Sequence, residues 1–127
     1  HYYPWDEEKL KLEYGDTPTY RIYQLKRENY GRLFTSYHRT IEQGFAVKAD
    51  DYELAYIADN TDGYDLDEIY EEFNIDRPDD FCGHSLSVGD VIAFKGKDGT
   101  EAYFVDSYGF EFLPDFFGAA QKKPAQM

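Results

Sequence analysis

A short loop in the second half of the sequence gathers side chains of the kind that act as a nucleophile and its base. In DFCGHSLS, Cys82, His84 and Ser85 are close neighbours, and Asp106 follows in a later turn. Nucleophilic catalysis needs a base within hydrogen-bond reach. Adjacent residues of an extended segment point to opposite faces, which disfavours a His84–Ser85 pair and makes His38 the better base. We favour a structural turn here, and we retain as candidate catalytic residues of a small enzyme His84, Ser85 and Asp106.

Two segments have part of a metal-site pattern. Cys82 and His84 supply two of the four ligands that a structural zinc site needs. The acidic segment DNTDGYDLDEIYEE (59–72) places Gly63 at the sixth position of a calcium-binding EF-hand loop, but its first and twelfth positions are then Ala58 and Ile69. Neither of these side chains has an oxygen ligand. We therefore expect no metal ion and no cofactor.

The same acidic segment predicts the start of an amphipathic helix. Asp65 and Glu68 have the spacing of a capping box, and Asp67 lies in the first turn, where the helix dipole favours negative charge. The core-facing stripe consists of Leu66, Ile69, Tyr70 and Phe73. Neither the cap nor the dipole explains the acidic residues that continue beyond the first turn. These are our candidates for binding a partner: Glu71, Glu72, Asp76, Asp79 and Asp80.

The remaining pattern predicts an α+β fold with a mostly antiparallel sheet of about five strands and two helices. Alternation predicts strands in TYRIYQLKRE (19–28) and YELAYIAD (52–59), and a helical period with capping residues runs from Asn29 to Gly44. We expect this first helix to cover the sheet. The C-terminal third predicts a β-meander that turns at Asp98-Gly99 and again at residues 107–109. We expect a loosely attached arm over 1–18, one domain over 19–117 and a disordered tail over 118–127.

Composition limits the classes of function. The chain has 127 residues, 42% of them hydrophobic and 19% aromatic, which suffices for one core. Residues 50–80 hold 13 of the 26 acidic residues and a single base, so this segment carries −12 of the net charge of −13. Such a patch repels nucleic acid and anionic lipid and attracts a basic partner. No apolar stretch has the length of a membrane span, and the one cysteine excludes an internal disulfide, so we expect a cytoplasmic protein.

Several motifs, in a fixed order, resemble the YodL-like domain family over residues 19–117. They are YRIYQLKRE (20–28), ADDYELAYIA (49–58), GHSLSVGDV (83–91), YFVDSYGF (103–110) and LPDFF (113–117). The resemblance implies a module of bacterial mobile elements, such as integrative and conjugative elements, often within a larger polypeptide. It assigns no reaction and no catalytic residue. A chain that begins at His1 rather than Met agrees with the expectation of a larger parent protein.

These observations predict a non-enzymatic protein-interaction module whose localised acidic face binds a basic protein. One alternative is a small enzyme with a pocket around the Gly-His-Ser loop. Another is an acidic mimic of nucleic acid that blocks a DNA-binding defence protein. Direct binding of nucleic acid is disfavoured, because the sequence has no basic stripe with interleaved aromatic residues. The sequence leaves the oligomeric state open.

Overall fold

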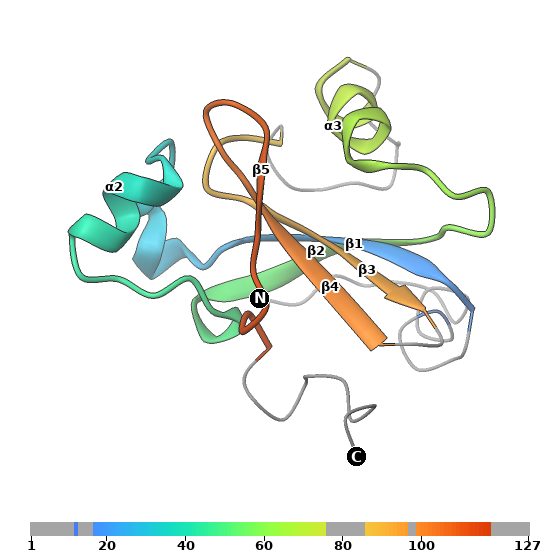
Figure 1. Cartoon of the computed structure of the whole chain (residues 1–127), viewed down its shortest axis with the longest axis horizontal. Coiled ribbons are helices and arrows are strands. Elements are labelled where there is room, and N and C mark those ends of the chain that lie inside the picture. The colour runs from blue at the N-terminus through green and yellow to red at the C-terminus, as the bar shows by residue number, and fades with distance from the viewer. Residues whose placement is uncertain (1–11, 13–16, 76–85, 97–98, 118–127) are drawn as a thin grey trace.

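The computed structural model describes residues 12, 17–75, 86–96 and 99–117. Within them, five strands form one antiparallel sheet in the order β2-β1-β3-β4-β5 (Figure 1). The strands are β1 (Thr19–Leu25), β2 (Tyr52–Asp59), β3 (Val91–Gly96), β4 (Gly99–Val105) and β5 (Phe110–Phe112). The predicted α+β class is confirmed, and so is the C-terminal meander, because β3, β4 and β5 are neighbours in both sequence and sheet.

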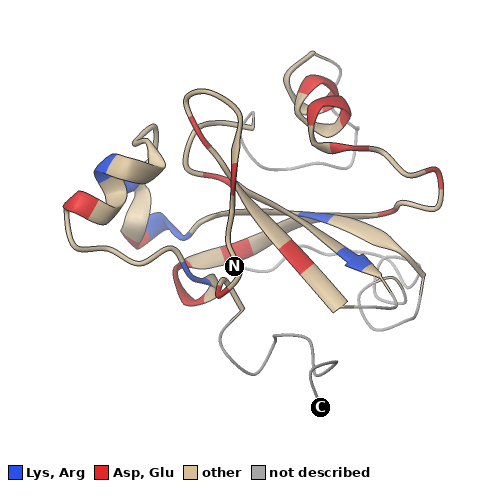
Figure 2. Cartoon of the chain, in the orientation of Figure 1, with Lys and Arg blue, Asp and Glu red and all other residues tan. Residues whose placement is uncertain are grey.

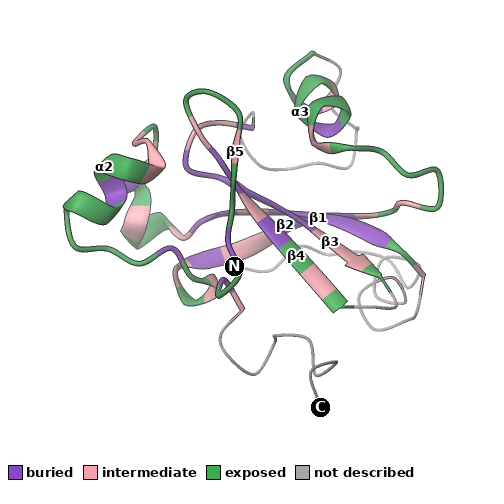
Figure 3. Cartoon of the chain, in the orientation of Figure 1, coloured by how far each residue is buried: buried purple, intermediate pink, exposed green. Residues whose placement is uncertain are grey.

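Helices lie beside the sheet and are short. The α-helices are α2 (Tyr37–Glu42) and α3 (Leu66–Ile75), and the 3-10 helices are η1 (Arg27–Arg32) and η2 (Ala49–Asp51). Helix α3 covers one face of the sheet (Figure 1). Its Ile69 and Phe73 are fully buried and pack with Tyr20, Ile22 and Ile92 from the two central strands (Figure 3). The predicted inward stripe of this helix is therefore confirmed at Ile69 and Phe73, and Leu66 is partly buried against the same cluster. The prediction is wrong at Tyr70, which is exposed.

A second core cluster lies on the other face of the sheet from Ile69 and Phe73. Its strand residues alternate along β3 and β4 with those that pack against α3. Val91 and Ala93 of β3 and Phe104 of β4 pack there with Leu113 and Phe116, which follow β5. Rings stabilise this cluster: Phe116 meets Phe117 edge to face at 4.9 Å between centroids, and Tyr37 of α2 meets Phe104 at 5.5 Å. With both faces of the sheet covered, α3 is held on a rigid platform.

The single helix predicted from Asn29 to Gly44 is wrong in its middle. The chain forms η1, leaves the helical conformation after Arg32, and begins α2 at Tyr37. Phe34 has a left-handed φ of 65°, and its N–H donates a hydrogen bond to the carbonyl of Val88 at 2.9 Å. This long-range contact is invisible to a local hydrophobic period, and it overrides helix propensity. Ser36 then caps α2, because its hydroxyl accepts from the Arg39 N–H at 3.2 Å.

Truncating the buried ring of α3 tests this packing. We expect Phe73→Ala to lower the free energy of unfolding by about 3–5 kcal/mol, because a fully buried phenylalanine leaves a cavity. Ile75, at the end of the same helix, is 77% exposed, so Ile75→Ala should change stability by no more than about 0.5 kcal/mol. Urea denaturation of both variants measures the difference. Equal losses would contradict the packing of α3 on the sheet.

Candidate functional site

The acidic loop before α3 is organised by its own side chains. The carboxylate of Asp59 accepts hydrogen bonds from the N–H and the hydroxyl of Thr61. These two bonds lower the pKa of Asp59. Asn60 closes the loop, since its side chain accepts from the Tyr64 N–H at 2.8 Å and donates to the Tyr64 carbonyl at 3.3 Å. The side-chain oxygen atoms of Asp59 and Asn60 thus form a polar turn.

The predicted capping box at the start of α3 is confirmed. The Asp65 carboxylate accepts from the Glu68 N–H at 2.9 Å, and the Glu68 carboxylate accepts from the Asp65 N–H at 2.9 Å. Both backbone donors would otherwise lack a partner at a helix start. Asp67 and Glu68 add negative charge in the first turn, where the dipole favours it, but the last turn carries no basic residue.

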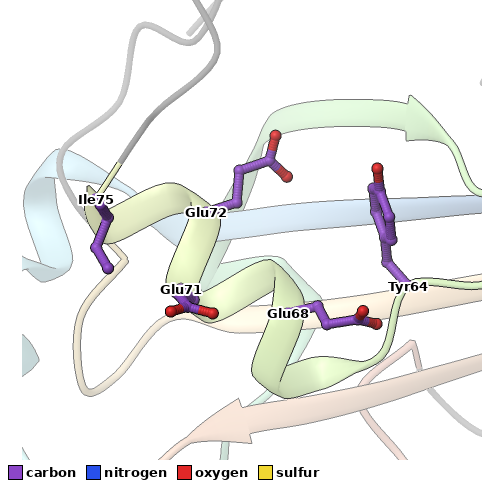
Figure 4. A pocket seen from close by; sticks show the side chains of 5 residues that line it. All are labelled: Tyr64, Glu68, Glu71, Glu72 and Ile75. Carbon is purple, nitrogen blue, oxygen red and sulfur yellow. The ribbon is translucent and has the colours of Figure 1, made fainter.

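Carboxylates of α3 line a hollow beside the helix. The hollow has a volume of about 340 Å³, and we call it the glutamate groove (Figure 4). Its lining consists of Tyr64, Glu68, Glu71, Glu72 and Ile75. Glu72 also accepts a long hydrogen bond, at 3.5 Å, from the hydroxyl of Tyr20 on the sheet. Burial, and then the nearby Glu72 charge, raise the pKa of Tyr20, so this hydroxyl stays a donor.

A second hollow lies where the start of α3 faces β3, β4 and β5. It measures about 490 Å³, and we call it the aromatic hollow. Four aromatic residues line it: Tyr64, Phe94, Tyr103 and Phe110. Three carboxylates line it as well: Asp65, Asp67 and Glu101. Since Tyr64 belongs to both linings, the aromatic hollow adjoins the glutamate groove.

The two hollows share a negative charge that no described base offsets. Figure 2 shows α3 with acidic positions and no basic one. Among the described residues, Arg32 forms an ion pair with Asp51 at 2.9 Å, and His38 lies 3.2 Å from the Glu42 carboxylate; neither contact involves α3. The chemistry that this surface offers is therefore attraction of cations next to exposed apolar and aromatic groups.

Only some of the predicted catalytic and partner-binding residues lie within the described part of the chain. The Asp106 carboxylate accepts two hydrogen bonds from backbone groups. The donors are the N–H of Tyr37, the first residue of α2, at 3.1 Å and the N–H of Ser107 at 2.8 Å. Glu71 and Glu72 both line the glutamate groove. The other candidates lie outside the described residues, namely Cys82, His84, Ser85, Asp76, Asp79 and Asp80. Among the residues described, no cluster of three or more metal-ligating side chains occurs, and no helix is long and apolar enough to cross a membrane.

Sequence reasoning missed one unusual carboxyl group, that of Asp90 at the entry to β3. It is fully buried and accepts hydrogen bonds from the Ser87 N–H at 2.9 Å and from the Gln24 side chain at 3.2 Å. Burial raises its pKa to about 8, against the hydrogen bonds, which lower it. Asp90 is therefore mostly neutral at pH 7. The serine three residues earlier was the only local signal, and that spacing is common in turns.

The fold and this surface define a small α+β domain with an open antiparallel sheet and one acidic helix on its face. The model of the YodL-like domain family matches residues 19–116, and the chain belongs to that family. No curated protein and no solved structure matches the chain. The family membership confirms the resemblance read from the sequence motifs.

Removing the cap tests the start of α3. We expect Asp65→Ala to lower the free energy of unfolding by about 1 kcal/mol, since the Glu68 N–H loses its acceptor. The exposed Asp62, which precedes the helix, serves as the control, and Asp62→Ala should leave stability within about 0.5 kcal/mol of the parent. Urea denaturation without added metal measures both variants. A smaller loss for Asp65→Ala than for Asp62→Ala contradicts the cap.

Burial of Asp90 predicts a specific dependence of stability on pH. The folded pKa of about 8 lies above the ordinary value of 3.8, so the folded protein keeps a proton that the unfolded chain releases between these values. The contribution of Asp90 to stability therefore falls as pH rises through this window, by up to about 1.4 kcal/mol per pH unit. We expect Asp90→Asn to remove that slope, as measured by urea denaturation from pH 5 to pH 8. Parallel curves for parent and variant would contradict it.

Proposed function

We propose that the domain is a non-enzymatic protein-interaction module that binds a basic segment of another protein along α3. The observation that carries the proposal is the glutamate groove, in which Glu68, Glu71 and Glu72 line one hollow with a tyrosine and an isoleucine. Ile75 is 77% exposed and Tyr64 42% exposed, although both belong to residue types that are more often buried. A large exposed apolar patch rimmed by polar residues marks an interaction site.

A basic polypeptide suits this surface better than other ligands. Lysine and arginine lay their methylene chains on apolar surface and place the charge at the end, which suits a lining that combines a tyrosine and an isoleucine with three carboxylates. Nucleic acids and anionic membranes are repelled by the −12 that residues 50–80 carry. The proposal therefore names a partner with clustered lysine or arginine residues.

The energetics predict association that is fast, sensitive to salt and modest in strength. Each exposed ion pair contributes about 0.2–1 kcal/mol, because water and mobile ions screen the charges. Three such pairs together contribute about tenfold in affinity. Concentrated charge mainly raises the association rate and aligns the partner.

The cellular setting is part of the same proposal. The family resemblance suggests that the domain serves a bacterial mobile element in the cytoplasm, as one part of a larger protein. A basic partner is then a second protein of the element or of its host. The acidic face supplies the binding chemistry in either case.

Neutralising the groove tests the proposal with a labelled oligolysine peptide as the probe. We expect Glu68→Gln, Glu71→Gln and Glu72→Gln, combined in one variant, to weaken binding about tenfold at low salt, because three ion pairs are lost. Fluorescence anisotropy measures the affinity, and raising the salt concentration should weaken parent binding steeply.

The matched control removes three glutamate charges elsewhere: Glu28→Gln, Glu42→Gln and Glu111→Gln, all at exposed positions outside α3 and outside the linings given for the two hollows. Both triple variants have the same net charge. We expect the control to keep most of the affinity of the parent. If the two triple variants lose affinity equally, the peptide responds to overall charge and the proposed binding face is wrong.

A further inference from the structure

The aromatic hollow has a lining that the glutamate groove lacks. Three half-buried rings form its wall on the sheet side, and these belong to Phe94 on β3, Tyr103 on β4 and Phe110 on β5. Ring contacts hold all three in place: Phe94 meets Tyr103 edge to face at 6.1 Å between centroids, and Phe110 meets Tyr70 of α3 at 6.1 Å. The wall is therefore built from side chains whose orientations are fixed by packing on a rigid sheet.

Three carboxylates complete the lining given for the hollow. Asp65 and Asp67 come from the start of α3, and Glu101 comes from β4. Glu101 accepts from the Tyr103 hydroxyl at 3.1 Å, which positions it next to the rings. A carboxylate has about four acceptor sites, so Glu101 and the capping Asp65 can each accept further hydrogen bonds. Lys95 follows Ala93 by two residues on β3 and so belongs to the opposite face of the sheet.

Rings together with carboxylates select one kind of cation. A guanidinium group is flat and weakly hydrated, stacks on aromatic faces, and pairs with a carboxylate through two parallel hydrogen bonds. An ammonium group is a compact and strongly hydrated charge that gains less from such a wall. Anions are excluded by the three carboxylates. The volume of about 490 Å³ lies within the range of sites for small ligands, and it accommodates one arginine side chain.

We propose that the aromatic hollow binds an arginine side chain, and that this arginine belongs to the basic segment lying in the glutamate groove. That the arginine belongs to a segment in the glutamate groove rests on the proposed function. That the aromatic hollow binds an arginine side chain does not. Tyr64 lines both hollows, so one extended segment passes from the groove into the aromatic hollow across this residue. The groove then supplies general attraction to positive charge, and the aromatic hollow supplies a preference for arginine over lysine.

The first test compares oligoarginine and oligolysine peptides of equal length. We expect the parent domain to bind oligoarginine about tenfold more tightly, because the guanidinium gains more from the rings than the ammonium group does. Combining Phe94→Leu with Phe110→Leu keeps apolar bulk but removes two rings, so it should abolish the preference for oligoarginine over oligolysine. Tyr108, which is 98% exposed outside the hollow, provides the control, and Tyr108→Leu should keep the preference. Equal affinities of the parent for the two peptides would overturn the inference.

The second test needs no variant and no peptide. Amide resonances of the isotope-labelled parent are followed by NMR during titration with N-acetyl-arginine amide, and with its neutral citrulline counterpart as the control. We expect shifts at Phe94, Tyr103 and Phe110 with the arginine compound only. Absent shifts, or equal shifts with citrulline, overturn the inference. Shifts specific to the arginine compound, together with peptide binding that ignores the groove glutamates, sustain the aromatic hollow and overturn the proposed function alone.

Discussion

Burial of Ile69 and Phe73 against the sheet determines the direction of every other side chain on α3. Both residues are fully buried, and they pack with residues of β1 and β3. A helix has about 3.6 residues per turn, so fixing these two positions sends Glu68, Glu71 and Glu72 to its flank and outer side. The start of the helix is held independently by the capping box. Neither hollow would exist in its present form if α3 rotated or moved away from the sheet.

The arrangement has a cost in stability. Glu68 lies three residues from Glu71 and four from Glu72, and like charges at such spacings destabilise a helix by about 0.2–0.5 kcal/mol per pair. The last turn of α3 carries no basic residue to complement the dipole. Hydrophobic burial must therefore hold the helix against its own charge. The hydrogen bond from Tyr20 to Glu72 offsets part of this repulsion, because it ties one of the glutamates to the sheet. Bound cations, or the proposed basic partner, would reduce the remaining repulsion between these glutamates.

Local patterns in the sequence were enough for α3, its capping box, the strands and the hairpin meander. These features depend on residues a few positions apart, whose preferences agree with the final fold. The break of the first predicted helix was beyond such reasoning, because it depends on the contact between Phe34 and Val88, far apart in sequence. The burial of Asp90 depends equally on packing against Gln24 of another strand. The aromatic hollow was missed for the same reason, since Phe94, Tyr103 and Phe110 meet only after three strands pair.

In the proposed interaction, the charge of the glutamate groove and the rings of the aromatic hollow have different roles. Carboxylates alone attract any cation, speed its approach and discriminate weakly, because exposed charges are screened and well hydrated. Selectivity requires a difference in binding free energy between competing ligands. The rings beside Glu101 create such a difference, since they reward a cation that gives up water easily and stacks on a flat surface. A glutamate groove without the aromatic hollow would be a general attractor of positive charge. The two together share Tyr64, and in the proposed interaction they would make the domain specific to a basic segment with an arginine at one defined position.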